Sequence, residues 1–186
     1  MSKADIVVAA NMAKKPIQLA DYIRDVPDFP KPGILFRDIT PLLADKKAFA
    51  AAVDALAQPF VGFDVDYVAA VEARGLIFGA AVAKALEAGF IPIRKQGKLP
   101  YKTESVTYDL EYGTDTLEVH GDAIKAGSEV LMVDDLLATG GTMAAACKLM
   151  AKLGAEICGL SFLIELTNLV GRKKLSGYSI HTVISY

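Results

Sequence analysis

Twice along the chain, an apolar strand pattern is followed by a loop, a helical pattern and a second apolar strand pattern. This repetition restricts the possible folds more than any other feature of the sequence. In the first motif, the apolar stretch Tyr67–Val71 leads into a polar loop at residues 72–75. A helical pattern then covers residues 77–88 and meets Gly89, a residue type that commonly follows a helix C-terminus. The next apolar stretch, residues 90–94, predicts the second strand.

The second motif repeats this order farther along the chain. It begins with a strand pattern at residues 129–133 and continues through a loop at residues 134–142. A helical pattern at residues 143–153 ends at Gly154, and a further strand pattern covers residues 157–164. Two strands joined by one helix pair in parallel, with a right-handed crossover. The sequence therefore predicts an α/β fold in which helices flank an open, mostly parallel sheet.

The region before the first motif is less regular. A length of 186 residues is typical of one domain, and residues 1–15 have no clear periodicity, so we interpret them as a loose extension. A short helix is predicted at residues 17–24, because Pro16 suits a first helical turn. Prolines and a glycine make residues 27–33 irregular, and the Ala-rich pattern of Lys46–Ala57 predicts an amphipathic helix.

The segment between the two motifs has a different character. Polar, β-branched and aromatic residues alternate at residues 98–119, which predicts a long flexible hairpin or lid rather than part of the core. A basic cluster, Arg94, Lys95, Lys98 and Lys102, overlaps its start. A solvated loop and a site for a small polyanion both explain this cluster.

The overall composition excludes several classes of protein. Hydrophobic residues make up 53% and charged residues 23%, which is typical of a folded globular chain. The net charge of −2 argues against a general nucleic-acid binder, and the apolar runs are shorter than the roughly 18 residues that cross a membrane. The N-terminal residues lack the features of a secretory signal. Cys147 and Cys158 lie in apolar segments without metal-ligand spacing, so buried free thiols and a cytoplasmic location are expected.

The stretch that says most about function is residues 130–142, Val-Leu-Met-Val-Asp-Asp-Leu-Leu-Ala-Thr-Gly-Gly-Thr. Open α/β sheets bind ligands at the carboxyl ends of their strands, where this stretch lies. Its glycines let backbone amides approach an anion, its threonines add hydroxyls, and the following helix adds the positive end of its dipole. Asp134 and Asp135 suit a sugar diol or a Mg²⁺-bound ligand. An ordinary strand-to-helix turn with an acidic pair is the alternative interpretation.

The complete run closely resembles the motif with which type I phosphoribosyltransferases bind 5-phosphoribosyl 1-pyrophosphate (PRPP). It has neither the Gly-Lys-Ser/Thr of a Walker A loop nor the Gly-x-Gly-x-x-Gly of a dinucleotide fingerprint. The resemblance implies that Asp134 and Asp135 contact the ribose hydroxyls. It also implies that five residues hold the 5′-phosphate: Ala138, Thr139, Gly140, Gly141 and Thr142.

Residues 29–43 resemble the base-binding hood of the adenine phosphoribosyltransferases within this family. Phe36 offers a ring on which a purine can stack, and backbone groups of Leu35 and Arg37 can hydrogen-bond its edge. For this stretch alone, a Pro-rich loop with a core phenylalanine is the alternative. The Ile-Glu-Leu sequence ending at Leu166 resembles the segment that completes the pocket, which implies that Leu166 packs on the base.

The Glu-Ala-Arg-Gly sequence at residues 72–75 resembles the pyrophosphate loop of the same family. The resemblance implies that the forked guanidinium of Arg74 binds the leaving group and serves in catalysis. Structural pairing of Arg74 with a carboxylate is the alternative. The second cationic contribution of the family is matched by Arg94, Lys95 and Lys98.

Residues 108–113 resemble the flexible catalytic loop of the adenine enzymes. The glutamate of that loop corresponds to Glu111, which the resemblance implies as a proton carrier for the purine ring. Glu104 is a competing candidate for this acid. A lid that closes here would exclude water from the reaction.

The resemblance covers the chain from about residue 17 to residue 186. It implies the type I phosphoribosyltransferase fold in a single domain over residues 1–186, with a hood at about residues 17–45. The implied reaction converts adenine and PRPP to AMP and pyrophosphate in purine salvage, in a cytoplasmic homodimer. Mg²⁺ is expected to bind mainly through PRPP, without a direct protein ligand. A 6-oxopurine (hypoxanthine, guanine or xanthine) phosphoribosyltransferase and a non-catalytic PRPP- or nucleotide-sensing regulator are the alternatives.

Overall fold

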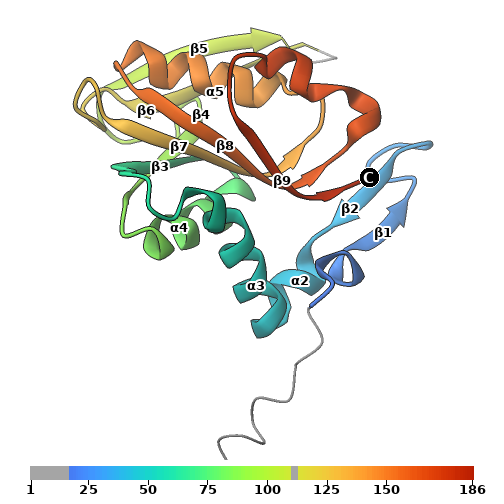
Figure 1. Ribbon diagram of the computed structural model, residues 1–186. Helices are drawn as coiled ribbons and strands as arrows, with labels where there is room; N and C mark the ends of the chain where they lie inside the picture. The colour runs from blue at the N-terminus through green and yellow to red at the C-terminus, as the bar shows by residue number, and fades with distance from the viewer. Residues whose placement is uncertain (1–16, 110–112) are drawn as a thin grey trace, which may run out of the picture. The chain divides into compact units, whose positions relative to one another are not determined.

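The computed structural model describes residues 17–109 and 113–186 (Figure 1). The chain divides into two units, Met1–Ala51 and Ala52–Tyr186. The second unit contains both strand–helix–strand motifs that the sequence predicts.

A seven-stranded sheet forms the centre of the second unit, with the strand order β5-β6-β4-β3-β7-β8-β9. Neighbours from β4 to β9 run parallel, whereas β6 pairs antiparallel with both β4 and β5. The open, mostly parallel sheet is therefore confirmed. The strands are β3 (Tyr67–Val71), β4 (Gly89–Lys95), β5 (Thr103–Asp109), β6 (Thr114–His120), β7 (Glu129–Leu137), β8 (Glu156–Glu165) and β9 (Ile180–Ser185).

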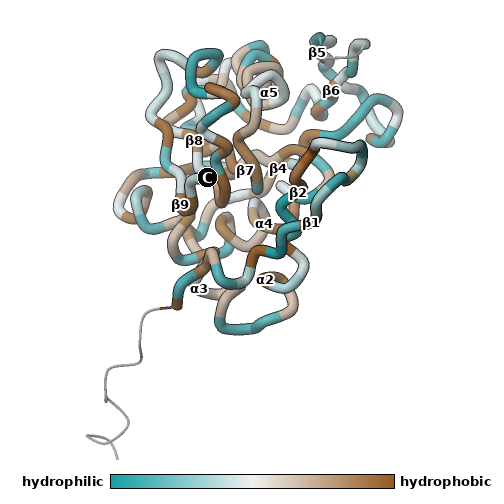
Figure 2. Tube along the Cα trace, turned by 90° about the vertical axis from the view of Figure 1, so that its right-hand side faces the viewer, coloured by the Kyte–Doolittle hydropathy of each residue, from teal (hydrophilic) through white to brown (hydrophobic). Residues whose placement is uncertain are grey.

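Helices cover both faces of this sheet (Figure 1). On one face, α5 (Gly141–Lys152) packs over a core that includes Val130 and Met132 of β7. On the other face, α4 (Gly75–Ala85) packs against β3 and β7. Successive strand residues point to opposite faces, so a strand covered on both sides consists of consecutive apolar residues. Hydrophobic residues accordingly concentrate on β7 and β8 in Figure 2. Short 3₁₀ turns complete the unit: η2 (Gln58–Phe60), η3 (Thr167–Leu169) and η4 (Gly171–Leu175).

The first unit contains a β-hairpin between two short helical segments. β1 (Arg24–Pro27) pairs antiparallel with β2 (Leu35–Asp38). The turn η1 (Leu19–Tyr22) precedes the hairpin, and α2 (Thr40–Ala44) follows it. A helix predicted at residues 17–24 is therefore wrong beyond this single turn. The chain becomes extended because β1 pairs with β2, and because a proline at the end of β1 disfavours a helical residue before it.

The helix α3 (Lys46–Ala57) has the predicted bounds and crosses from the first unit into the second. It begins after Asp45, whose Oδ1 accepts hydrogen bonds from the N–H groups of Lys47 and Ala48. Within the second unit, the Ser161 hydroxyl donates to the Leu56 carbonyl oxygen at 2.9 Å. This bond ties the end of α3 to β8.

Two further predictions need correction. The hairpin predicted between the motifs is confirmed as β5–β6, but its exclusion from the core is wrong, because Leu117 and Val119 of β6 are buried in the core beside α5. The loop predicted to begin at Asp134 is also wrong in part. The ladder between β7 and β8 continues to the pair Leu137–Glu165, so both aspartates are strand residues.

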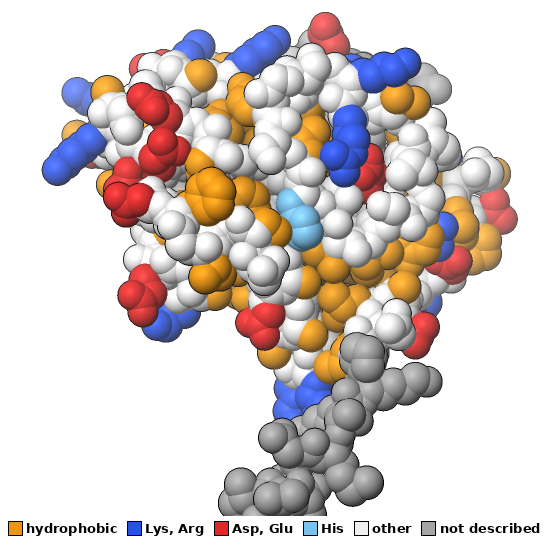
Figure 3. Space-filling view, viewed as in Figure 1, with side chains coloured by type: hydrophobic (Ala, Val, Ile, Leu, Met, Phe, Trp, Pro, Cys, Tyr) orange, Lys and Arg blue, Asp and Glu red, His pale blue; other side chains and the backbone are white. Residues whose placement is uncertain are grey.

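Side chains of both charges are interspersed on the face shown in Figure 3. This distribution agrees with a net charge of −2. Within residues 17–109 and 113–186, no helix is long and apolar enough to cross a membrane.

Candidate active site

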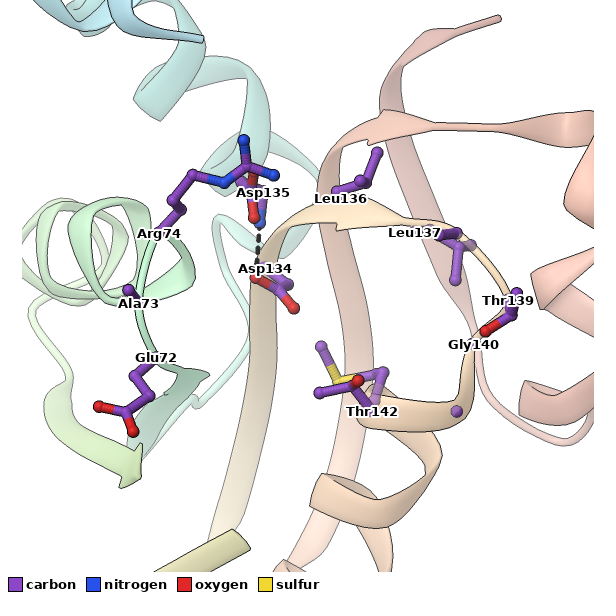
Figure 4. A pocket seen from close by; sticks show the side chains of 13 residues that line it. Glu72, Ala73, Arg74, Asp134, Asp135, Leu136, Leu137, Thr139, Gly140 and Thr142 are labelled. Carbon is purple, nitrogen blue, oxygen red and sulfur yellow. Dashed lines mark hydrogen bonds and ion pairs between the residues drawn. The ribbon is translucent and has the colours of Figure 1, made fainter. Parts of the chain in front are cut away.

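β3 and β7 are neighbours at the point where the strand order reverses, since β4 pairs with β3 on one side and β8 pairs with β7 on the other. Open α/β sheets bind ligands at such a switch point. A cavity of about 390 Å³ lies there, between the β3–α4 loop and the β7–α5 connection (Figure 4). Its lining residues are Glu72, Ala73, Arg74, Asp134, Asp135, Leu136, Leu137, Ala138, Thr139, Gly140, Gly141, Thr142 and Met143.

The connection between β7 and α5 forms one wall of the cavity. Only residues 138–140 lie between the end of the strand and the start of the helix. Gly140 is the N-cap of α5 and has a φ of 76°, a left-handed conformation that glycine adopts without strain. The first turn of α5 leaves N–H groups without intrahelical acceptors, and the side chains of Thr139 and Thr142 line the same wall. All five predicted phosphate-binding residues thus lie together at a helix N-terminus, which favours an anion.

Asp134 and Asp135 are adjacent at the end of β7 and form the next part of the wall. The N–H of Asp135 donates to Asp134 Oδ1 at 2.8 Å, the dashed line in Figure 4. A Cβ on Gly75 would lie 2.5 Å from the same oxygen, so a side chain there would displace the Asp134 carboxylate. Burial raises the pKa of both carboxyls, the neighbouring carboxylate raises that of Asp134 further, and Arg74 opposes the rise at Asp135. The pair therefore holds negative charge less readily than exposed aspartates do.

Arg74 lies at the start of α4 and extends toward Asp135 (Figure 4). Its Nη2 lies 2.8 Å from Asp135 Oδ2, in an ion pair whose carboxylate is almost fully buried. The Arg74 side chain is 31% exposed and lines the cavity. The structure therefore pairs Arg74 with a carboxylate and also places it where a ligand would bind.

Glu72 lines the cavity and also forms hydrogen bonds with the predicted basic cluster. Its Oε2 accepts a hydrogen bond from Arg94 Nε at 2.5 Å, and its Oε1 accepts one from the N–H of Lys95 at 2.6 Å. Burial raises the pKa of Glu72, but these hydrogen bonds outweigh it and lower the pKa. The Lys95 ammonium lies 3.1 Å from Asp115, and the exposed Lys98 acts on Glu72 through its charge. The three cations thus gather around Glu72, beside the cavity rather than in its lining.

Three of the predicted adenine-binding residues, Leu35, Phe36 and Arg37, are consecutive on β2 in the first unit. The Phe36 ring packs edge to face on Phe29, with 5.1 Å between centroids. Arg37 forms an ion pair with Asp25 across the hairpin. Their contact with a base stays a prediction.

The other residues predicted for the base side lie in the second unit. Leu166 directly follows β8, and its N–H donates to the Leu137 carbonyl oxygen at 2.9 Å, which places its backbone beside the cavity wall. Glu104 is exposed on β5, and Glu111 lies outside the described residues. The choice between these two acids stays open.

Two side chains near the cavity were not assigned a role from the sequence. Glu72 follows the last apolar residue of β3, just as Asp134 follows Val133 at the end of the apolar stretch of β7, so an acid after a buried strand is a signal for both. The Tyr108 hydroxyl lies 3.4 Å from the Thr142 hydroxyl. That approach depends on the packing of β5 against α5, which local sequence does not reveal.

Comparisons with known proteins agree with this geometry. Residues 42–181 match the family of the phosphoribosyl transferase domain. The adenine phosphoribosyltransferase of Rhodopirellula baltica is 56% identical over 176 residues, which cover 93% of this chain and 85% of the relative. The crystal structure of adenine phosphoribosyltransferase from Thermoanaerobacter pseudethanolicus is similar with a TM-score of 0.88 and 53% identity, covering 91% of this chain and 98% of that one. The enzyme from Saccharomyces cerevisiae, complexed with an imino-altritol bisphosphate and adenine, has a TM-score of 0.85 at 40% identity, covering 89% of this chain and 96% of that one. This chain therefore belongs to the adenine phosphoribosyltransferases, a family built on the phosphoribosyl transferase domain.

Proposed function

We propose that this chain transfers the 5-phosphoribosyl group of PRPP to adenine in purine salvage, releasing AMP and pyrophosphate. The observation that carries the proposal is the shared cavity. It brings an acidic pair, a glycine-rich helix N-terminus and an arginine to the carboxyl ends of β3 and β7. A sugar phosphate with a second anionic group needs these three features close together.

Phosphate and ribose are assigned to the β7–α5 side of the cavity. Residues 138–142 would hold the 5′-phosphate with backbone N–H groups and threonine hydroxyls. Asp134 and Asp135 would accept hydrogen bonds from the ribose hydroxyls. Hydroxyl donors favour the charged form of a carboxylate, so sugar binding would offset part of the cost of the buried pair.

The leaving pyrophosphate is assigned to the β3–α4 side. Substitution at the anomeric carbon creates positive charge on the ribosyl ring and negative charge on the departing group. Arg74 would neutralise the departing charge directly, while Arg94, Lys95 and Lys98 add positive potential around Glu72. The acidic pair would lie on the ribosyl side and stabilise the positive charge there.

Adenine is assigned to the segments with hood-like sequence. Phe36 would stack on the base, backbone groups of Leu35 and Arg37 would bond its edge, and Leu166 would pack on it from the end of β8. The crystal structure of the yeast relative is described as a complex with adenine, which supports this substrate. We assign proton transfer to Glu111, with Glu104 as the competing acid.

The residues present fit a Mg²⁺ ion that arrives with PRPP. Among the described residues, no group of three or more His, Cys, Asp or Glu side chains could hold a metal. Asp134 and Asp135 offer only two carboxylates, and Mg²⁺ commonly keeps several waters while binding one or two carboxylates and substrate phosphates. When bound, the ion supplies positive charge to the pyrophosphate.

We extend the proposal to the organisation of the protein. The chain would act as a homodimer in the cytoplasm, as a single catalytic domain with a hood at about residues 17–45 and an extension at residues 1–15. Sedimentation equilibrium of the purified protein tests the dimer, and a mass equal to one chain would contradict it.

A substrate panel tests the activity. Purified protein is incubated with PRPP, Mg²⁺ and radiolabelled adenine, hypoxanthine, guanine or xanthine, and the nucleotides are separated. We expect AMP and equimolar pyrophosphate, with adenine preferred. Preference for a 6-oxopurine would overturn the specificity. PRPP binding without turnover of any base would instead indicate a sensing regulator.

A further inference from the structure

Residues 138–140 of the cavity wall pack against Gly171, in the C-terminal part of the second unit. A Cβ added to Gly140 would fall well inside van der Waals contact of the Gly171 carbonyl oxygen. A Cβ added to Gly171 would overlap the Ala138 carbonyl oxygen and lie 2.9 Å from Leu137 Cδ1 and 3.1 Å from the Gly140 nitrogen. The two backbones therefore touch, and neither position has room for a side chain.

The segment that carries Gly171 is anchored by its neighbour, Arg172. The Arg172 guanidinium forms a two-pronged ion pair with Glu165, in which Nε and Nη2 each lie 2.8 Å from a carboxylate oxygen. It also donates to the Ile180 carbonyl oxygen at 3.3 Å and to the Thr182 hydroxyl at 3.2 Å. Glu165 is 6% exposed, and the hydrogen bond from Arg172 lowers its pKa. The Arg172 side chain is itself 46% exposed, so the anchor depends on its two-pronged geometry and on the buried carboxylate.

The anchor and the cavity wall are joined through β8. Glu165 is the register partner of Leu137, the last residue of β7 before the turn. The N–H of Leu166 donates to the carbonyl oxygen of the same Leu137. Arg172 thus fixes η4 to the strand that flanks the turn, and η4 holds Gly171 against the turn itself.

We propose that Gly171 is a positioning residue for the phosphate turn, and that the Arg172–Glu165 pair holds it in place. This inference rests on the proposed function, since it assigns the turn to the 5′-phosphate. A helix N-terminus binds phosphate through several N–H groups at once, so a shift of the turn weakens all of these bonds together. Loss of the contact between Gly171 and the turn should therefore weaken only the binding of ligands that carry the phosphate.

Gly171→Ala is the direct test, and Gly121→Ala is its matched control. The nearest atom to a Cβ on Gly121 is the Lys102 carbonyl oxygen at 3.9 Å, and neither glycine has a positive φ. Binding of ribose 5-phosphate is measured by calorimetry, the KM values for PRPP and adenine by steady-state kinetics, and folding by thermal unfolding. For Gly171→Ala we expect the affinity for ribose 5-phosphate to fall, and the KM for PRPP to rise, by about tenfold or more. The KM for adenine should stay within about twofold of the wild-type value. A tenfold change corresponds to the loss of one charge-assisted hydrogen bond. Gly121→Ala should match the wild type.

Arg172→Gln and Arg172→Lys keep the test decisive if Gly171→Ala does not fold. Arg172→Gln should weaken ribose 5-phosphate binding, and Arg172→Lys should recover part of the loss because it keeps the charge without the fork. A folded Gly171→Ala variant with unchanged ribose 5-phosphate affinity would overturn this inference but not the proposed function. Absence of ribose 5-phosphate binding by the wild type would count against the proposed function instead.

Discussion

The acidic pair on β7 shows how buried carboxyls reduce the stability of the fold as the pH rises. Burial raises the pKa of Asp134, and the neighbouring carboxylate of Asp135 raises it further. An aspartate in an unfolded chain loses its proton near pH 4. Above that pH the unfolded chain is therefore more ionised than the folded chain, and the free energy of unfolding falls as the pH rises toward the raised pKa.

Replacing Asp134 by asparagine should remove this loss of stability. The amide oxygen of the new side chain would still accept the hydrogen bond from the Asp135 N–H, but the amide cannot ionise. We expect Asp134→Asn to match the wild-type Tm near pH 4 and to exceed it by about 3 to 5 °C at pH 8. Differential scanning calorimetry across this range is the measurement, with Asp54→Asn on the exposed side of α3 as the control for charge. A lower Tm for Asp134→Asn at pH 8 would refute the argument.

Arg74 should be sensitive to the loss of its fork even when its charge is kept. Lysine retains the positive charge but offers a single ammonium in place of the planar guanidinium. We expect Arg74→Lys to lower kcat about 10- to 100-fold while Tm changes little. Arg74→Ala should also lower Tm, because it leaves Asp135 buried without its cation. Wild-type kcat in Arg74→Lys would remove the fork from the mechanism.

At this scale, the sequence predicts residues that follow a local rule. Asp134 and Asp135 are identifiable because acids directly follow an apolar strand, and Gly140 because it lies in a Thr-Gly-Gly-Thr run between a strand pattern and a helical pattern. The Arg74–Asp135 and Arg94–Glu72 pairs are different. Each joins residues from separate strands or loops, so they become visible only once β3, β4 and β7 lie side by side.

Among the elements, α4 lies close to the sheet because of a glycine in its middle. A Cβ on Gly79 would overlap Ala70 Cβ on β3 and lie 2.9 Å from the Phe90 ring on β4. Neither Ala70 Cβ nor the backbone behind it can move independently of the strand. The approach fixes the start of α4, where Arg74 and Gly75 border the cavity.

Gly79→Ala should therefore destabilise the fold despite the better helix propensity of alanine. Propensity favours alanine by about 1 kcal/mol, whereas overpacking a core typically costs about 1–3 kcal/mol. We expect a net loss of free energy of unfolding in urea titrations. Ala80→Gly, on the exposed side of the same helix, measures the propensity alone. Equal or higher stability of Gly79→Ala would show that α4 moves freely on the sheet.

Elements with their own periodicity are the ones that the sequence predicts. α3 has the expected bounds, and each end of α5 and β8 lies one or two residues from the position expected for it. The sequence does not predict β1, because pairing with β2 extends residues that locally favour a helix. Nor does it predict β9, although residues 180–185 are partly apolar, because the place of β9 at the sheet edge is set by its pairing with β8.

For the molecule as a whole, folding determines the reactivity of the two thiols. Cys147 is buried and Cys158 is half-buried, and both are free. Burial raises the pKa of Cys147 to about 12 and that of Cys158 to about 11. Because the thiolate is the reactive form, neither side chain reacts readily while the second unit is folded.

Alkylation should distinguish the folded chain from the unfolded one. With iodoacetamide at pH 8, we expect little modification of the native protein over minutes, and rapid modification of both cysteines in concentrated urea. Mass spectrometry counts the added groups. Rapid double labelling of the native protein would mean that these segments open far more often than their burial suggests.

The order of segments along the chain has a consequence for biosynthesis. The turn at residues 138–140 leaves the ribosome before α5 and β8, and Gly171 emerges only after both. At roughly 5–20 residues per second, a few seconds separate these events. A nascent chain therefore exposes the proposed phosphate-binding turn before the segment that contacts it, and we expect full affinity for sugar phosphates only once that later segment has docked.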